Sequence, residues 1–347
     1  MNPQKVVMSQ NLEEALTAAV ATCEKDRVFI LTDETPQQLC LPLVEGFACL
    51  KGAQHITIGA TDTHKTLDSL SHVWEALGEG GATRHSLLIN IGGGMVTDLG
   101  GFAASTFKRG INYINIPTTL LSMVDASVGG KTGINFRGLK NEIGVFNNAE
   151  TVILDTQFLK TLDTENILSG YAEMLKHGLI DSEAHWAELI NSDLSNLGSL
   201  SKLLEKSVAV KQRIVTEDPT EQGIRKALNL GHTAGHAFES FALSKQPILH
   251  GYAVAYGLVC ELYLSAIKTG FPTDKMHQTV NFIHEHYGRM NITCDDYPQL
   301  LELMTHDKKN VAGVINFTLL GGIGDIRINQ HATKDEIYEA LDFYREG

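Results

Sequence analysis

The run LLINIGGGMVTD at residues 87–98 indicates how the first half of the chain folds. Its first five residues form a short apolar run that predicts a buried strand, and the three glycines then open a helix. Glycines at such a turn allow a pyrophosphate group to approach the backbone amides at the helix N-terminus, where the helix dipole favours negative charge. The run lacks the GxGxxG spacing, so a tight turn without a ligand remains the alternative.

Four further runs in the first half predict buried strands. Apolar residues at helical spacing lie between several of them, for example at residues 66–80. This alternation is typical of a largely parallel sheet covered on both faces, so we expect an α/β nucleotide-type domain over residues 1–158. Two hydroxyls, of Thr118 and Thr119, follow one of the runs at the sheet edge where open α/β sheets bind ligands, which favours a dinucleotide site. The four runs are residues 27–31, 55–58, 113–116 and 151–154.

The second half has a different pattern, dominated by helices. Strand-like runs almost disappear after residue 162, apart from a pair at residues 314–320 and 326–328 with Gly321 and Gly322 between them. We therefore expect an all-helical domain, with this pair as its exception, over residues 159–347. The predicted helices are residues 165–180, 200–216, 229–243, 253–268 and 272–287.

Composition and charge restrict the possible partners of the chain. Its 347 residues are 43% hydrophobic and 20% charged, as in an ordinary globular protein that buries a large core. The formal net charge of −13 argues against nucleic acid and against an anionic membrane surface, because both require a basic face. An anionic small molecule is still compatible, provided that a local group of basic side chains binds it.

The cysteines and the N-terminal sequence point to the cytoplasm. The five cysteines are odd in number and lack CxxC spacing, which favours free thiols in a reducing compartment over a cysteine zinc site. We see no signal peptide and no apolar run of membrane-spanning length. The sequence therefore predicts a cytoplasmic protein.

Three histidines suggest a metal site in the second half. In the run NLGHTAGHA, at residues 229–237, His232 and His236 are four residues apart and project from one face of the predicted helix. A third histidine, His250, follows before another apolar helix, and each of the three is next to a glycine. Single histidines on a helix face are more often packed or solvated, but three so close together favour a divalent metal beside an anionic ligand.

Charged residues near these histidines allow two interpretations. Glu173 and Lys176 lie three positions apart on an apolar helix, either as a surface pair worth a few tenths of a kcal/mol or as a third metal ligand and a substrate contact. One glutamate with two histidines is a common set for a catalytic zinc with an open position. The guanidinium of Arg225 suits a carboxylate, although a helical ladder of Glu221, Arg225 and Asn229 is the alternative.

Several lysines can be interpreted either as anion-binding residues or as ordinary surface residues. The run DASVGGKT at residues 125–132 looks like the end of a P-loop, but the upstream glycine is missing because position 125 is Asp125. Lys131 on its glycine-rich turn and Lys140 in a nearby loop are therefore either anion contacts or surface lysines. By composition, Lys308 belongs to a charged turn.

Taken in order, these segments resemble the 3-dehydroquinate synthase family of sugar-phosphate cyclases. The resemblance extends from about Asp33 to Asp325, and so many motifs in one order are far more specific than any one of them. The segments are GGGMVTDLGGF, FKRG, IPTTLL, DASVGGKT, LKN, GYAEMLKHG, SVAVKQRIVTED, EQGIRKALNLGHTAGHA, LHG and HDKK.

The resemblance implies a fold, two cofactors and a set of site residues. The expected fold is a Rossmann-like NAD domain followed by a helical domain, in a homodimer that holds a divalent metal, zinc or cobalt. The metal ligands would be Glu173, His232 and His250, with His236 as a substrate and proton-transfer residue. The NAD contacts would be Asp33, Asp62, Lys65, Gly93, Gly94, Asp98, Thr118 and Thr119. The substrate contacts would be Asp125, Lys131, Lys140, Asn141, Lys176, Lys211, Arg225, Asn229 and Lys308, joined by Arg109 from the neighbouring subunit.

Four positions depart from the family pattern. Tyr252 stands where the family usually has Glu, Asp62 where Glu usually precedes the NAD lysine, Leu139 where Gly is usual and Thr35 where Asn is usual. None of them removes an implied metal ligand or lysine, but each can change substrate preference or NAD affinity.

The activity implied is conversion of 3-deoxy-D-arabino-heptulosonate 7-phosphate to 3-dehydroquinate and phosphate, in the shikimate route to aromatic amino acids. Three alternatives remain. A metal-dependent polyol dehydrogenase would consume NAD, a related cyclase would use a sugar phosphate without a carboxylate, and a non-catalytic protein would only bind NAD or an anion. The presence of Arg225 and Asn229 argues against the second alternative, and the complete set of ligands and lysines argues against the third.

Overall fold

The computed structural model describes residues 4–194, 196–243, 245–305 and 315–347. The chain forms two compact units, Met1–Asp163 (unit 1) and Thr164–Gly347 (unit 2). The sequence-based division after residue 158 falls within a short 3-10 helix, η6 (Thr156–Thr161).

Unit 1 is built on a six-stranded sheet in which all neighbouring strands are parallel, in the order β1-β8-β5-β4-β2-β3. Every residue of β4 (Leu87–Gly92) is buried, which explains its largely apolar sequence, LLINIG. The five predicted strands are present, and β1 adds an edge. The strands are β1 (Lys5–Met8), β2 (Val28–Asp33), β3 (Gln54–Ile58), β4 (Leu87–Gly92), β5 (Asn112–Pro117) and β8 (Thr151–Leu154).

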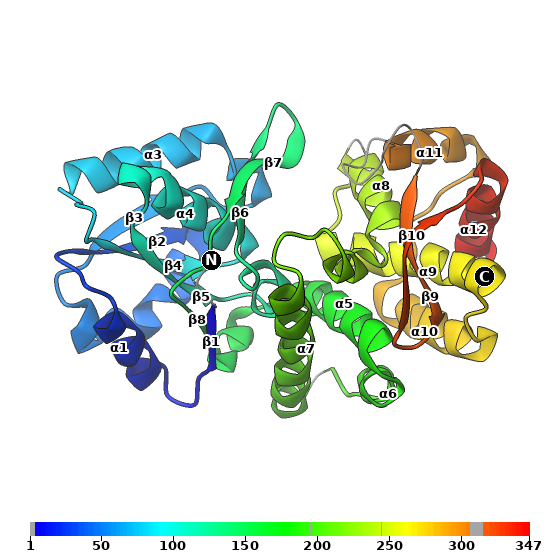
Figure 1. Cartoon of the computed structure of the whole chain (residues 1–347), viewed down its shortest axis with the longest axis horizontal. Coiled ribbons are helices and arrows are strands. Elements are labelled where there is room, and N and C mark those ends of the chain that lie inside the picture. The colour runs from blue at the N-terminus through cyan, green and yellow to red at the C-terminus, as the bar shows by residue number, and fades with distance from the viewer. Residues whose placement is uncertain (1–3, 195, 244, 306–314) are drawn as a thin grey trace. The chain divides into compact units, whose positions relative to one another are not determined.

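Helices cover both faces of this sheet. In Figure 1, α3 and α4 lie on one side of the strands and α1 lies on the other. The α-helices of unit 1 are α1 (Leu12–Thr22), α2 (Glu34–Leu39), α3 (Leu67–Glu79) and α4 (Gly94–Thr106). Short helical turns connect them: η1 (Leu41–Leu43), η2 (Ala48–Leu50), η3 (Asp62–His64), η4 (Phe107–Arg109) and the π-helix η5 (Ser122–Ala126).

A separate antiparallel hairpin, β6 (Lys131–Phe136) and β7 (Leu139–Phe146), corrects one sequence-based expectation. The expectation that Lys131 lies on a turn and Lys140 in a loop is wrong, because both lie on strands. Two other glycines, one in each strand, are needed by the pairing. Gly133 faces Gly144, and a Cβ on Gly144 would lie 1.9 Å from the carbonyl oxygen of Thr132.

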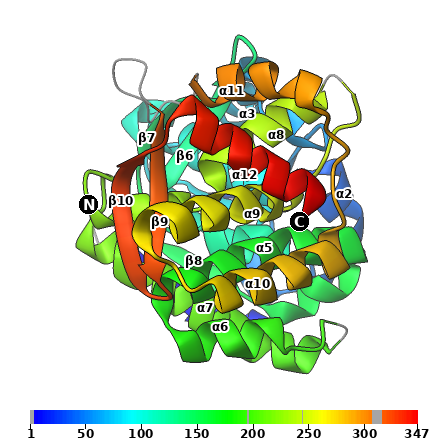
Figure 2. The same cartoon turned by 90° about the vertical axis from the view of Figure 1, so that its right-hand side faces the viewer.

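Unit 2 is a helical bundle arranged around α9. Figure 2 shows α9 between α12 on one side and α5 and α10 on the other, with the hairpin β9–β10 beside them. The elements are α5 (Thr164–Asp181), α6 (Glu183–Ile190), α7 (Leu197–Glu217), η7 (Ile224–Asn229), α8 (His232–Leu243), α9 (His250–Thr269), α10 (Thr273–Tyr287), η8 (Cys294–Asp296), α11 (Tyr297–Thr305), β9 (Asn316–Gly322), β10 (Asp325–His331) and α12 (Lys334–Glu346).

The predicted fold class is confirmed: a parallel α/β domain precedes a helical domain. The expected strand pair of the second half is present as β9 and β10, although the first residue predicted for it, Val314, lies outside the described residues. Three helices, α6, α11 and α12, were not predicted. Within the described residues, no helix combines the length and the hydropathy needed to cross a bilayer.

Candidate metal centre and nucleotide site

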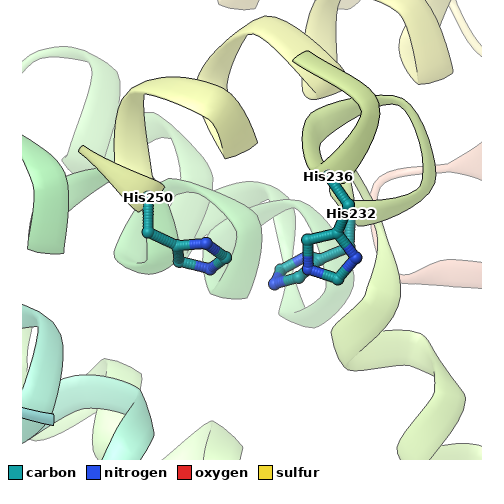
Figure 3. Close-up of side chains that lie close together, drawn as sticks. All are labelled: His232, His236 and His250. Carbon is teal, nitrogen blue, oxygen red and sulfur yellow. The ribbon is translucent and has the colours of Figure 1, made fainter. Parts of the chain in front are cut away.

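Three imidazoles converge in unit 2. His232 and His236 lie one turn apart on α8, and His250 is the first residue of α9. Figure 3 shows the three rings turned toward one space, with ring centroids 5.3 to 5.9 Å apart. One nitrogen from each ring lies within 4.8 Å of the others, a spacing that a single cation can bridge.

A fully buried carboxylate on α5 faces two of these rings. Glu173 Oε1 lies 3.3 Å from His232 Nε2 and 3.5 Å from His250 Nε2. Its other oxygen forms an ion pair with Lys176, which is also buried. Burial would raise the pKa of Glu173, but Lys176 and His232 outweigh burial and hold that pKa well below its usual range. The interpretation of Glu173 and Lys176 as a surface pair is therefore wrong.

The second nitrogen of each of these two rings has its own acceptor. His232 Nδ1 lies 3.1 Å from the carbonyl oxygen of Leu230, and His250 Nδ1 lies 3.3 Å from a carboxylate oxygen of Glu239. A metal-bound histidine usually donates its other N–H to such an acceptor, which leaves Nε2 for the metal. Both Nε2 atoms point to the same oxygen of Glu173. The Nδ1 contacts and the positions of the Nε2 atoms therefore both favour metal binding through Nε2.

The buried carboxylate fits a divalent cation. Among the residues that the structure describes, no donor makes a well-directed hydrogen bond to either oxygen of Glu173. Such an anionic oxygen is costly to bury even beside Lys176, and a cation between it and the two imidazoles would reduce that cost. Glu173, His232 and His250 would leave one tetrahedral position open for a ligand. The structure brings His236 to the same space, and which three of the four side chains bind the metal stays a prediction.

Basic side chains of unit 2 are buried to an unusual degree. Lys176, Lys211 and Arg225 each expose 5% or less of their surface. Arg225 Nη1 donates to the carbonyl oxygen of Pro219 at 2.6 Å, and Asn229 Nδ2 donates to Glu221 Oε1 at 2.8 Å.

The alternative interpretation of Glu221, Arg225 and Asn229 as a helical ladder is wrong. Arg225 and Asn229 lie on the 3-10 helix η7, and Glu221 precedes it in a left-handed conformation, with φ of 62°. Asp218 accepts from the backbone N–H groups of Gly223 and Arg225 and so fixes the start of η7. The last predicted anion contact of this unit, Lys308, lies outside the described residues.

The predicted nucleotide contacts of unit 1 gather at the carboxyl edge of its sheet. Asp33 ends β2, Gly93 and Gly94 follow β4, and Thr118 and Thr119 follow β5. The strand order reverses between β2 and β4, because β3 lies beyond β2 whereas β5 lies beyond β4. Open α/β sheets bind ligands at such a reversal, and the N-terminus of α4 offers its backbone amides there.

A buried lysine connects this edge to the β6–β7 hairpin. Lys65 forms an ion pair with Asp98 of α4 and a hydrogen bond with Asn141 of β7. Burial raises the pKa of Asp98, and Lys65 opposes that effect. The carboxylate of Asp62 lies 3.4 Å from Lys140 Nζ, so this predicted NAD contact also faces the hairpin.

Three remaining candidates lie at exposed or intermediate positions of unit 1. Arg109 is exposed at the end of η4 with φ of 70°, Asp125 lies in η5, and Lys131 is the exposed first residue of β6. Their roles stay predictions.

Sequence reasoning missed two carboxylates in unit 2, Glu239 and Glu261. Glu239 is buried on α8 and contacts His250, as described above. Glu261 is fully buried on α9 and accepts hydrogen bonds from the backbone of Gly231 and Ala234. A charged residue inside the apolar run AVAYGLVCELYLSAI, at residues 253–267, was the signal available for Glu261.

Two family signatures together match most of the chain. The one described as 3-dehydroquinate synthase N-terminal matches residues 55–169, and the one described as 3-dehydroquinate synthase C-terminal matches residues 170–310. The 3-dehydroquinate synthase of Parabacteroides distasonis is 55% identical over 350 residues, which cover 100% of this chain and 99% of that protein. The 3-dehydroquinate synthase of Pyrococcus furiosus is 41% identical over 304 residues, 88% of this chain and 89% of that protein.

Solved structures show the same fold. A 2-epi-5-epi-valiolone synthase from Streptomyces hygroscopicus subsp. jinggangensis, with NAD+ and Zn2+ bound, has a TM-score of 0.88 at 25% identity and covers 99% of this chain and 97% of its own. A 2-deoxy-scyllo-inosose synthase complexed with carbaglucose-6-phosphate, NAD+ and Co2+ has a TM-score of 0.82 at 21% identity, covering 99% and 96%.

Proposed function

Because the chain belongs to the 3-dehydroquinate synthase family, we propose that it converts 3-deoxy-D-arabino-heptulosonate 7-phosphate into 3-dehydroquinate and phosphate. This makes it a carbon–oxygen lyase that eliminates phosphate. One structural observation supports the proposal most directly: the fully buried carboxylate of Glu173 faces the Nε2 atoms of His232 and His250. The two family signatures and the 55% identical relative confirm the resemblance to this family.

The proposed cofactors are NAD and one divalent cation, zinc or cobalt. Glu173, His232 and His250 would hold the cation, and the carboxyl edge of the unit 1 sheet would hold NAD. When bound, the cation acidifies substrate hydroxyl groups, and NAD accepts a hydride and later returns it. The valiolone synthase with NAD+ and Zn2+ bound supports this pair of cofactors.

The buried basic side chains of unit 2 are suited to binding an anionic sugar phosphate. Lys176 and Lys211 would offset negative charge that develops on the substrate, because preorganised cations act strongly where water is excluded. Arg225 and Asn229 would bind the carboxylate end, and His236 would carry a proton beside the metal ligands. Lys131, Lys140, Asn141, Asp125 and Lys308 are the remaining proposed substrate contacts.

We further propose a homodimer in which Arg109 serves the active site of the partner subunit. Arg109 is exposed in its own unit, and both it and Lys108 have positive φ, so η4 projects these side chains from a constrained turn. The proposed partners are thus the sugar phosphate and a second copy of the chain.

Phosphate release with and without a chelator tests the reaction. The protein would be incubated with the heptulosonate phosphate, NAD+ and Zn2+, while phosphate, 3-dehydroquinate and absorbance of NADH are followed. We expect stoichiometric phosphate and 3-dehydroquinate, no accumulation of NADH, and loss of both products with the chelator. Accumulation of NADH in proportion to substrate would instead identify a polyol dehydrogenase.

A related cyclase acting on a substrate without a carboxylate is the second candidate, because a 2-epi-5-epi-valiolone synthase and a 2-deoxy-scyllo-inosose synthase share the fold. Replacement of Arg225, the proposed carboxylate contact, distinguishes the two candidate functions. If the substrate carries a carboxylate, glucose 6-phosphate is not turned over, and Arg225→Ala raises KM for the heptulosonate phosphate. Turnover of glucose 6-phosphate that survives Arg225→Ala would favour the second candidate.

A further inference from the structure

The N-terminus of α8, the helix that carries His232 and His236, lacks a capping side chain of its own. Gly231 is its N-cap, since the carbonyl oxygen of Gly231 accepts from Gly235 N at 3.1 Å. The N-cap of a helix is commonly Ser, Thr, Asp or Asn, whose side chain accepts a hydrogen bond from the backbone N–H of the third helical residue. A Glu at that third position can in turn accept from the backbone N–H of the N-cap residue. Here the N-cap is glycine and the third residue is Ala234, so neither can do so.

Glu261 of α9 supplies both bonds from the facing helix. Gly231 N donates to Glu261 Oε2 at 2.6 Å, and Ala234 N donates to Glu261 Oε1 at 3.1 Å. These are the two backbone groups that a capping box satisfies, and one buried carboxylate accepts from both. Because hydrogen bonds to an ionised carboxylate are strong and the helix N-terminus favours negative charge, this arrangement restrains the first turn of α8.

Close packing of the two helices explains why the cap comes from α9. A Cβ on Gly257 would lie 1.9 Å from the carbonyl oxygen of Gly231, and a Cβ on Gly231 would lie 2.8 Å from Leu258 Cγ. Gly231 also has φ of 79°, which disfavours other residues. There is no space for a capping side chain at position 231. Glu261, one turn after Gly257, instead reaches the two backbone N–H groups that have no partner within α8.

We propose that Glu261 is a positioning residue for the metal centre. It restrains the backbone on both sides of His232, whose Nδ1 contacts the carbonyl oxygen of Leu230, the residue just before Gly231. A shift of this turn would therefore rotate the imidazole away from Glu173. The inference rests on the metal site proposed above and assigns to it a residue that does not touch the metal.

Metal binding by Glu261→Gln tests the proposal. Glutamine keeps the size of the side chain but has one acceptor oxygen and places an N–H donor against a backbone N–H. Co2+ alone would be titrated into the metal-free full-length protein while its visible absorption spectrum is followed. We expect the dissociation constant to rise about 10- to 100-fold, as for other outer-shell partners, and the spectrum to change because the ligand geometry changes.

Ser265→Ala is the matched control. Ser265 lies one turn beyond Glu261 on the same helix, is equally buried, and also accepts from a backbone N–H, that of Leu320 on β9 at 3.0 Å. Its loss removes two buried hydrogen bonds, from Leu320 N and to the carbonyl oxygen of Glu261, but leaves the Glu261 carboxylate and its two bonds to α8 in place. We expect Ser265→Ala to lower the thermal stability while the Co2+ affinity and spectrum stay those of the wild type.

Amide exchange of the metal-free protein provides a second test, which needs no metal. The amides of Gly231 and Ala234 should already be protected before metal is added, and less protected in Glu261→Gln. Exchange at these two amides as fast as in an unfolded peptide would overturn the proposal, as would unchanged Co2+ binding in Glu261→Gln. If the wild type itself bound no Co2+, the proposed metal site would fail instead, so the two failures are distinguishable.

Discussion

Glu173 and Lys176 show at the scale of single residues how burial changes the meaning of an ion pair. Exposed on a helix, such a pair contributes only a few tenths of a kcal/mol, about 0.2–0.5. In the structure both side chains are almost fully buried, and the carboxylate also faces two imidazoles. Keeping a carboxylate ionised away from water requires positive charge nearby, so the pair belongs to the site and not to the surface.

Replacement of a proposed ligand should remove the metal without unfolding the protein. His250 begins α9 and is partly exposed, so His250→Ala leaves no large cavity. We expect purified His250→Ala to contain no bound zinc by atomic absorption and to lose turnover, while its circular dichroism matches the wild type. The exposed His277 of α10 gives the control, since His277→Ala should retain both metal and turnover. Full turnover of a metal-free His250→Ala would contradict the ligand assignment.

The affinity for metal should rise with pH. Burial alone would lower the pKa of His250, but Glu239 and hydrogen bonds to Glu173 and Glu239 outweigh burial and raise that pKa to about 10. Burial lowers the pKa of His232 to about 3, so that ring is already neutral at pH 7. A metal ion therefore displaces one proton, from His250, and log affinity should increase by about one unit per pH unit between roughly pH 6.5 and 8.5.

Removing the charge of Glu239 should weaken this pH dependence. In Glu239→Gln the amide oxygen can still accept from His250 Nδ1, but the carboxylate that favours the protonated ring is gone. The pKa of His250 then falls, and the Co2+ affinity should level off at a lower pH than in the wild type. Identical slopes for the two proteins over the same pH range would contradict the assigned role of Glu239.

At the scale of elements, the β6–β7 hairpin carries three proposed substrate contacts on a frame that depends on glycine. Gly133 and Gly144 face each other across the strands, and the turn uses Arg137 and Gly138, both with positive φ. Two consecutive residues of positive φ are typical of the tight turns that match the twist of a hairpin. The element is thus specified by backbone geometry more than by apolar alternation.

Gly144→Ala should disrupt the hairpin and, with it, substrate binding. The added methyl group would lie 1.9 Å from the carbonyl oxygen of Thr132, so the strands must separate. We expect a loss of about 1–3 kcal/mol in the free energy of unfolding and a higher KM for the heptulosonate phosphate, because Lys140 and Asn141 lie on the same strand. Gly138→Asn is the control, since asparagine tolerates positive φ and no atom lies within 4 Å of a Cβ there. Equal KM values for the two variants would contradict this account.

At the scale of the whole molecule, the net charge of −13 contrasts with the basic groups buried in unit 2. An anionic substrate therefore depends on a few preorganised cations, while the overall field opposes its approach. One proposed contact, Arg109, would come from a second subunit, and this can be tested directly.

Mixed dimers test whether active sites are shared. Arg109→Ala and Lys131→Ala should each be inactive alone, because each removes one proposed contact from every site. In a dimer of one subunit of each kind, one of the two sites has both residues intact. Random exchange of equal amounts should therefore restore about a quarter of wild-type activity. No recovery after exchange, verified by native mass spectrometry of the mixed dimer, would argue against sharing.

Local sequence patterns were sufficient to predict most of the strands and helices. Strands such as β4 read as continuous apolar runs because helices bury both their faces, and long helices such as α5 and α7 show their spacing directly. The hairpin β6–β7 was not predicted because its strands, KTGINF and LKNEIGVF, show little alternation of apolar and polar residues. The segment that carries Arg225 forms the 3-10 helix η7, in which Asp218 and Pro219 bind its backbone and guanidinium.

The sequence by itself determined the family, the order of the two domains and the types of residue available for a site, because these follow from motif order and from local periodicity. Only the tertiary structure decided that Glu173 is buried, that Glu239 contacts His250, and that Glu261 caps the helix bearing His232. The physical reason is that burial and hydrogen bonding join residues far apart in the chain. Spacing along one helix carries no information about the side chains that a second helix brings against it.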